Sequence, residues 1–183
     1  MNQHKAYKFR LYPNQKQATL INKTIGCTRF VFNHFLGKQK AQDAYWYITE
    51  ELVQNGQLPR NQWKGAFFQK YDTIKSLPEL KKHYPFLKEV DSISLQASVE
   101  HLYDAYSRYY KKQNQVPRFN SKKNPVQSYT TKVTNSNVAI DGNRVKLPKL
   151  GWVRFAKSRE VEGRILNATI RRNPSGKFFI SLV

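Results

Sequence analysis

The sequence predicts an α+β fold in which a small antiparallel β-barrel is interrupted by a helical insertion. Three observations predict it. The chain opens on an alternating strand, its middle carries apolar stripes at helical spacing, and its last third consists of short β-prone runs separated by turn signals. Because the first strand and the late strands flank the helical segment, we expect them to join in one sheet.

The opening strand has one apolar face and one basic face. Tyr7, Phe9 and Leu11 alternate with Lys8 and Arg10. Successive side chains of a strand point to opposite sides, so this pattern is typical of a half-buried strand with a basic outer surface.

A helix is expected to follow at once. Asn14 and Gln17 have the spacing of a capping box, which marks a helix start. Gly26 is expected to interrupt this helix, so that a second helix runs from Cys27 to Tyr47. This arrangement permits a helix-turn-helix, although the spacing alone does not identify one. Cys27 lies among apolar residues and is expected to be a buried structural thiol.

The middle of the chain predicts two more helices. A short one is expected around Trp63–Ile74, before a stretch broken by Pro78 and Pro85. A longer one begins near Ser92. Its apolar residues recur at i, i+4, i+7, i+8, i+11 and i+15, a stripe suited to packing on other helices: Leu95, Val99, Leu102, Tyr103, Tyr106 and Tyr110.

After Pro117 the pattern changes to short strands. The expected runs are Ser128–Thr134, Val138–Ile140, Arg144–Leu147, Trp152–Ala156, Leu166–Arg172 and Lys177–Val183. An Asp-Gly turn and a Pro-Ser-Gly turn separate some of them, which favours antiparallel hairpins. The last run is expected to leave an exposed edge.

Charge indicates the kind of partner. The chain holds 32 Lys and Arg against 12 Asp and Glu, a formal net charge of +20. Nine of the 12 acidic residues fall within residues 43–104, so the basic excess lies on both sides of a near-neutral island. With 39% hydrophobic residues the chain can bury a core, and no apolar run has the length of a membrane span. Aromatic residues stand among the basic ones, a mixture suited to RNA or single strands. We expect a cytoplasmic protein.

Five motifs, in this order, resemble the TnpB/OrfB family of insertion-sequence proteins. They are Lys5–Asn14, Gly26–Leu36, Pro117–Phe119, Leu147–Val153 and Gly163–Leu166. Members of that family are RNA-guided DNA endonucleases, and the resemblance covers nearly the whole chain. It implies that residues 1–14 and 126–183 form a wedge-like β-barrel and that residues 15–125 form a helical recognition lobe. It also implies two partners, namely a guide RNA from the transposon end and double-stranded DNA carrying a short adjacent motif.

The resemblance further implies that the catalytic part lies elsewhere. The family's RuvC-like nuclease domain, which uses divalent metal and zinc, would follow the region matched by Lys177–Val183. The acidic residues of this chain are scattered, whereas two-metal cleavage needs converging carboxylates. We therefore expect no catalytic residue, metal ligand or cofactor in this chain, and binding without cleavage. Two alternatives remain: one piece of a split nuclease completed by a separate RuvC-like domain, or an autonomous helix-turn-helix regulator.

Two sets of residues are candidates for nucleic-acid contacts. By the resemblance, Gln96, Thr134 and Asn135 would read the DNA motif, since amide side chains can pair with adenine and Thr can contact a thymine methyl. The candidates for phosphate or RNA contacts are Lys5, Lys8, Arg10, Arg29, Arg118, Lys122, Lys123, Lys146, Lys149, Arg171 and Arg172.

Overall fold

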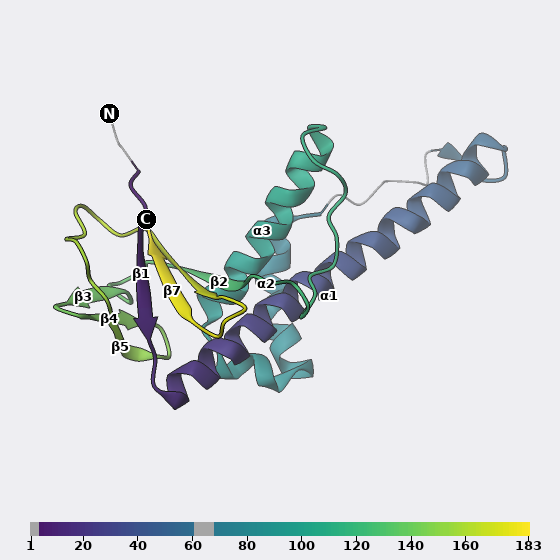
Figure 1. The fold of residues 1–183 in the computed structure, drawn as a ribbon. Coiled ribbons are helices and arrows are strands. Elements are labelled where there is room, and N and C mark those ends of the chain that lie inside the picture. Colours follow the sequence, from purple (N-terminus) through teal and green to yellow (C-terminus); the bar gives the residue numbers. More distant parts are fainter. Residues whose placement is uncertain (1–3, 61–67) are drawn as a thin grey trace.

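The fold is seen in a computed structural model that describes residues 4–60 and 68–183. The elements follow the order expected for a sheet with a helical insertion (Figure 1). They are β1 (Tyr7–Tyr12), α1 (Gln15–Gln54), α2 (Lys70–His83), the 3-10 helix η2 (Pro85–Glu89), α3 (Ser92–Tyr110), β2 (Gln127–Lys132), β3 (Ala139–Asp141), β4 (Arg144–Leu147), β5 (Gly151–Phe155), β6 (Asn167–Arg172) and β7 (Phe178–Leu182). The predicted α+β class is confirmed.

The strands form one antiparallel sheet of seven, in the order β2-β6-β7-β1-β5-β4-β3. The predicted closure into a barrel is wrong. Within the described residues β2 and β3 each pair on one side only, so the sheet has two ends. Consecutive in the chain, these two strands are separated by a turn in which Asn135 and Ser136 both adopt positive φ. A strand of three residues such as β3 also offers few backbone groups for a closing pair.

The last strand does not form an exposed edge, contrary to the sequence prediction. β7 pairs with β6 on one side and with β1 on the other. The first and last strands are therefore neighbours in the middle of the sheet, and the long-range pairing joins the two ends of the described chain (Figure 1).

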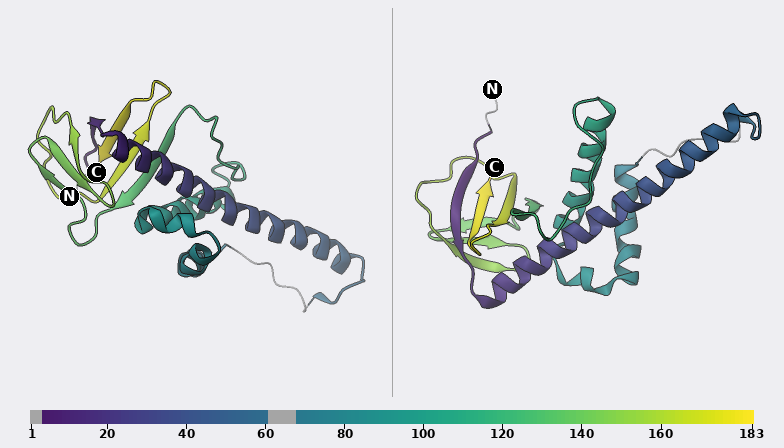
Figure 2. Two further views of the ribbon diagram at one scale, coloured as in Figure 1. Left: turned by 90° about the horizontal axis from the view of Figure 1, so that it is seen from below. Right: turned by 45° about the vertical axis from the view of Figure 1, so that its right-hand side comes forward.

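A single unbroken helix replaces the two predicted around Gly26. The capping box is present, with Gln17 N donating to Asn14 Oδ1 at 2.9 Å. The helix continues because its buried stripe does: Ile25 packs in the sheet core, and Cys27, buried as predicted, packs in the helical core. Glycine inside a helix costs roughly 1 kcal/mol, which burial on both sides outweighs. In both views of Figure 2 the far half of α1 extends well beyond the sheet.

The helices share their own core. The stripe predicted for the helix at Ser92 is confirmed for four of its six residues, with Leu95, Val99, Leu102 and Tyr106 buried against α1 and α2. Tyr103 is half-buried and Tyr110 is exposed. The helix predicted around residues 63–74 lies partly outside the described residues, and its residues 70–74 belong to α2.

Pro78 does not break the chain as predicted, but lies inside α2. Its ring is exposed, whereas the neighbouring Leu77 and Leu80 are buried and hold the helix against the core. No helix within residues 4–60 and 68–183 combines the length and the apolar character that crossing a membrane requires.

One buried carboxylate joins the helices to the sheet. Asp91 caps α3 by accepting from the backbone of Ile93 and Ser94 at 3.1 and 3.2 Å. The same side chain accepts a hydrogen bond of 2.6 Å from Thr131 Oγ1 in β2. Because Thr131 is completely buried, this contact determines how α3 lies along the end strand of the sheet.

Candidate nucleic-acid interface

The sheet has an apolar side and a basic side. In β1, Tyr7, Phe9 and Leu11 enter the core, and Lys8 and Arg10 point away from it. The same alternation continues in the neighbouring strands, since paired residues share a side. We call the side away from the core the outward face.

Besides Lys132, which forms an ion pair with Glu100, six basic residues lie on the outward face. They are Lys8, Arg10, Arg144, Lys146, Arg154 and Arg171. None of them forms an ion pair with any residue in the described part of the chain. The strands contain one acidic residue, Asp141, at the far end in β3. This face therefore carries uncompensated positive charge, which attracts a polyanion.

Aromatic rings alternate with these cations across the strands. In one row of the sheet register, Phe179 stands between Arg171 and Arg10. In the next, Tyr12 pairs with Arg154. A third ring, Trp152, is 44% exposed beside Lys146.

Two of these rings, Phe179 and Tyr12, restrict the positions of three of the cations. The Lys8 Nζ lies 4.9 Å from the centroid of the Phe179 ring, and the Arg10 guanidinium lies 5.7 Å from it. The Arg10 guanidinium is also 5.2 Å from the Tyr12 ring, and that of Arg154 is 5.0 Å from the same ring. Such cation–π contacts restrict long side chains without neutralising them. The charge stays available to a ligand.

A second basic region lies where α1 meets the ends of β2 and β6. Arg29 Nη1 donates to Gln127 Oε1 at 2.9 Å, and Arg172 Nη1 donates to Asn22 Oδ1 at 2.5 Å. Burial, and then the nearby Arg172, lower the pKa of Arg29. Guanidinium groups remain protonated in proteins, so both residues keep their charge beside neutral amide partners.

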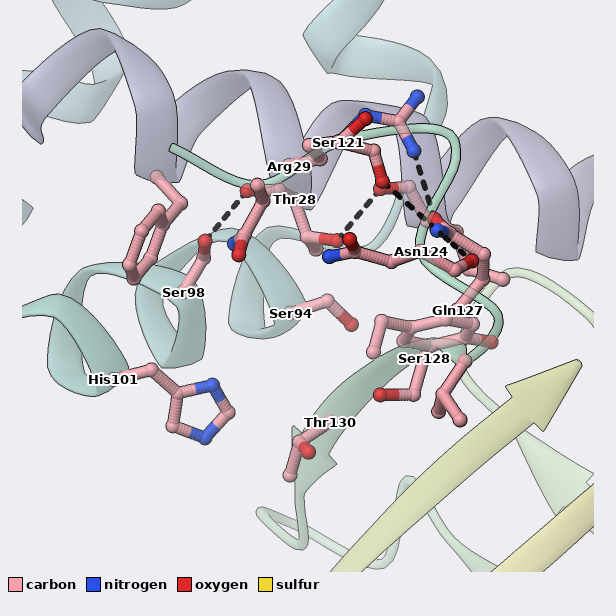
Figure 3. A pocket seen from close by; sticks show the side chains of 15 residues that line it. Thr28, Arg29, Ser94, Ser98, His101, Ser121, Asn124, Gln127, Ser128 and Thr130 are labelled. Atoms are coloured by element: carbon pink, nitrogen blue, oxygen red, sulfur yellow. Dashed lines mark hydrogen bonds between the residues drawn. The ribbon is translucent and has the colours of Figure 1, made fainter. Parts of the chain in front are cut away.

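A polar pocket opens next to this region (Figure 3). Hydroxyl, amide and imidazole side chains from α1, α3, β2 and the preceding loop line it, among them Ser98, His101, Asn124 and Thr130. Desolvation lowers the pKa of His101, although its surface is still exposed to solvent, and this favours the neutral imidazole. A pocket with this lining is suited to polar or anionic groups rather than to apolar ligands.

The loop before β2 brings three further cations to this side of α1. Arg118, Lys122 and Lys123 are exposed in it. The loop is tied to α1, because Asn33 donates to the carbonyl of Asn120 at 2.9 Å and accepts from its backbone N–H at 2.8 Å. These cations therefore have a defined position relative to α1.

Comparison with known proteins agrees with this chemistry. Residues 1–45 match the HTH_OrfB_IS605 family model, described as a helix-turn-helix domain. The RNA-guided DNA endonuclease InsQ of Escherichia coli (strain K12) is 29% identical over 185 residues, covering 100% of this chain and 40% of that protein. An RNA-guided DNA endonuclease of Streptomyces pristinaespiralis is 28% identical over 185 residues, covering 98% of this chain and 41% of that protein.

This chain is similar to OrfB/TnpB-type proteins. The resemblance recognised from the five motifs is thereby confirmed. The chain spans about 40% of the length of the curated relatives it matches. In the described part of the region matched to the OrfB model, residues 4–45 form β1 and one continuous stretch of α1, so the two predicted helices of a helix-turn-helix are replaced by a single helix.

The structure places the three residues that the OrfB/TnpB resemblance assigned to DNA-motif reading on neighbouring exposed segments. Gln96 is exposed on α3, one turn before Glu100, and Glu100 forms an ion pair with Lys132 at the end of β2. Thr134 and Asn135 follow that strand end directly and are exposed. Among the described residues no hydrogen bond or ion pair links Gln96 to the other two, and their role in DNA reading stays a prediction.

The turn that contains Thr134 has a structural role of its own. Its backbone N–H donates to Asn137 Oδ1 at 2.8 Å, and Asn137 Nδ2 donates to the carbonyl of Lys132 at 3.0 Å. These bonds shape the turn through its backbone. Within residues 4–60 and 68–183 the side chains of Thr134 and Asn135 form no hydrogen bond, so they can contact a ligand.

The predicted phosphate-contact residues divide into groups. Lys8, Arg10, Lys146 and Arg171 come together on the outward face, as the strand register requires. The second group is Arg29 and Arg172 with the loop residues Arg118, Lys122 and Lys123, close to α1. Their contacts with nucleic acid remain predictions.

Two predicted residues stand apart from both groups. Lys5 forms an ion pair of 3.1 Å with Glu162, so its charge is already compensated. Lys149 adopts positive φ in the turn between β4 and β5 and lies near Lys81 of α2, away from the outward face.

Sequence reasoning missed five residues of the outward face. They are Tyr12, Arg144, Trp152, Arg154 and Phe179. The available signal was the alternation within β4 and β5, where every second residue is basic or aromatic.

Among residues 4–60 and 68–183, no three His, Cys, Asp or Glu side chains lie close enough together to hold a metal ion.

Proposed function

We propose that this chain is the guide-RNA-binding and motif-reading part of an OrfB/TnpB-type system. The outward face binds the phosphate backbone of a structured RNA from the transposon end. Gln96, Thr134 and Asn135 read a short motif in the adjacent double-stranded DNA. The chain works in the cytoplasm and binds without cutting.

The outward face is the observation that carries this proposal. Six cations of this face have no acidic partner in the described part of the chain, and two aromatic rings, Phe179 and Tyr12, hold three of them. A polyanion can neutralise this surface, and its exposed rings can stack on unpaired bases. Most readers of the major groove present a helix, whereas the basic side chains of the outward face lie on strands.

The relatives' names support the RNA partner and the link to DNA cleavage. Both matched relatives are named RNA-guided DNA endonucleases, and this chain corresponds to about 40% of each. Cleavage would then require a RuvC-like domain with its metal ions, supplied separately, while this chain needs no cofactor to bind. Incubation of the chain with guide RNA, target DNA and Mg²⁺ should leave the DNA intact, and cleavage by the purified chain would contradict this part.

Reversing two charges of the outward face tests the RNA assignment. The variant Lys8→Glu/Arg10→Glu should bind a transposon-end RNA more weakly, and the slope of log K against log salt should flatten by about 1.4, because each lost contact with a single strand no longer releases a counterion. Fluorescence anisotropy over a salt series measures both quantities. An unchanged slope would show that β1 does not face the RNA backbone.

A matched control keeps the change in net charge but moves it elsewhere. Lys75→Glu/Lys88→Glu alters two exposed cations on α2 and η2. It should leave RNA binding nearly unchanged at moderate salt. Equal losses in both variants would mean that only net charge matters. Preference for duplex DNA over structured RNA at matched salt would favour the regulator alternative instead.

A further inference from the structure

Two arginines at the junction of α1 and the sheet are held next to each other without an acid. Each guanidinium is bonded to a neutral amide, Arg29 to Gln127 and Arg172 to Asn22. Asn22 and Arg29 lie two turns apart on one face of α1, and Gln127 and Arg172 are cross-strand partners in β2 and β6. The four side chains therefore form one cluster across the junction.

This cluster is electrostatically costly in the free protein. Two like charges at close range repel each other, and partial burial raises the cost of each. A lowered pKa for Arg29, caused first by burial and then by Arg172, is the expected sign of both effects. Within the described residues neither arginine forms an ion pair, so the folded chain does not relieve this repulsion itself.

The cluster is also preorganised. Gln127 is buried, and its Nε2 donates to the carbonyls of Ser121 and Asn124, both at 3.0 Å. These bonds orient the Oε1 that accepts from Arg29, as Figure 3 shows. The planar guanidinium group of Arg29 is thereby held in one orientation. Its paired N–H groups match the spacing of phosphate oxygens.

The helix surface beside Arg29 is bare. Gly26 lies one turn earlier, and a Cβ built there would meet only Arg29 Nη2, at 3.9 Å. The missing side chain leaves room for a group that approaches the helix backbone next to the guanidinium.

We propose that Arg29 and Arg172 together bind one phosphate group of a nucleic-acid strand between α1 and the β2–β6 pair. A phosphate anion at this position offsets the repulsion, takes the free N–H groups of both guanidinium groups and uses the space above Gly26. The site is separate from the outward face, and it rests on the proposed function because the phosphate belongs to the bound strand.

A double-mutant cycle tests the shared phosphate. Affinity for transposon-end RNA is measured over a salt series for the full chain and for Arg29→Gln, Arg172→Gln and the double variant. Each single variant should bind about tenfold more weakly, as expected for one lost charge-assisted hydrogen bond. The double variant should lose little more, because either change already breaks the shared site. Circular dichroism verifies folding. If Arg29→Gln does not fold, Arg29→Lys replaces it, since it keeps the charge but loses the planar fork.

The control is Arg164→Gln, which removes an exposed cation from the loop between β5 and β6 and should leave the affinity unchanged. Losses in the double variant equal to the product of the single losses would overturn the shared site, because they indicate two independent contacts. Unchanged affinity in both single variants would also overturn it. The hydrogen bonds from the two arginines to Gln127 and Asn22 would then have a structural role only.

Inorganic phosphate separates the two sources of the anion. The melting temperature is compared in phosphate and in chloride at equal ionic strength. If phosphate stabilises the parent chain but not Arg29→Gln, while the two bind RNA equally, the site takes a free anion and the strand assignment is wrong. Weaker binding by Lys8→Glu/Arg10→Glu with normal binding by Arg29→Gln overturns this site and leaves the proposed function standing. If the parent chain binds no RNA, both fail.

Discussion

Replacing Gly26 by alanine tests whether α1 is one helix or two. Gly26 lies inside α1, and its φ is not positive, unlike that of Gly142 in the β3–β4 turn. A Cβ at position 26 would meet Arg29 Nη2 at 3.9 Å, which is an ordinary van der Waals contact. No steric penalty therefore opposes the substitution in the free protein.

The magnitude follows from helix propensity. Alanine is favoured over glycine in a helix interior by roughly 1 kcal/mol, so Gly26→Ala should raise the free energy of unfolding by about that amount. For a chain of this size the melting temperature should rise by about 2–4 °C. Thermal and urea unfolding followed by circular dichroism at 222 nm measure both quantities.

Gly142→Ala is the matched control with the opposite sign. Gly142 has φ +56°, a conformation that costs an L-residue about 1–2 kcal/mol, so alanine there should destabilise the protein. If Gly26→Ala were destabilising by a similar amount, the chain would turn at Gly26 and the single-helix description of α1 would be refuted.

Three further outcomes are expected. Asp91→Ala should lower the free energy of unfolding by about 2–4 kcal/mol, because it removes the α3 cap and leaves the buried Thr131 hydroxyl unpaired. Denaturant titration measures this loss, and a value below about 1 kcal/mol would contradict the prediction. Gln96→Ala should change DNA sequence preference in a binding selection while RNA affinity stays constant, and unchanged preference would remove Gln96 from the motif readers. Burial raises the pKa of Tyr129, which favours the neutral phenol in the folded state. Its contribution to stability is therefore complete below the unfolded pKa of about 10 and is lost as pH rises above it. Between about pH 8 and 11 the free energy of unfolding should fall less steeply with pH in Tyr129→Phe than in the parent chain. Equal slopes of the two chains would contradict this.

Local sequence patterns determined most of the elements and the sides that their residues occupy. Alternation in the first strand separated Tyr7 and Phe9 from Lys8 and Arg10, and the structure confirms both sides. The apolar stripe after Ser92 predicted α3 from its spacing alone. These predictions succeed because periodicity is a local property that each element carries in its own residues.

Only the tertiary structure decided which residues meet. Strand register places Phe179 beside Arg10, although these residues stand at opposite ends of the sequence. Alternation shows on which side of a strand a residue falls but not which strand is its neighbour, because pairing is a long-range choice. The aromatic support of the outward face therefore became visible in the structure alone.

The continuity of α1 likewise separates what the local sequence predicts from what tertiary packing decides. By itself, Gly26 indicates a break, because its local cost is real. Ile25 in the sheet core and Cys27 in the helical core outweigh that cost by packing on opposite sides of the glycine. The sequence thus determined the basic strand, the helical stripe and the resemblance to OrfB/TnpB-type proteins. The fold alone decided that one helix spans both cores and brings Arg29 close to Arg172, since these depend on burial against segments far away in the chain.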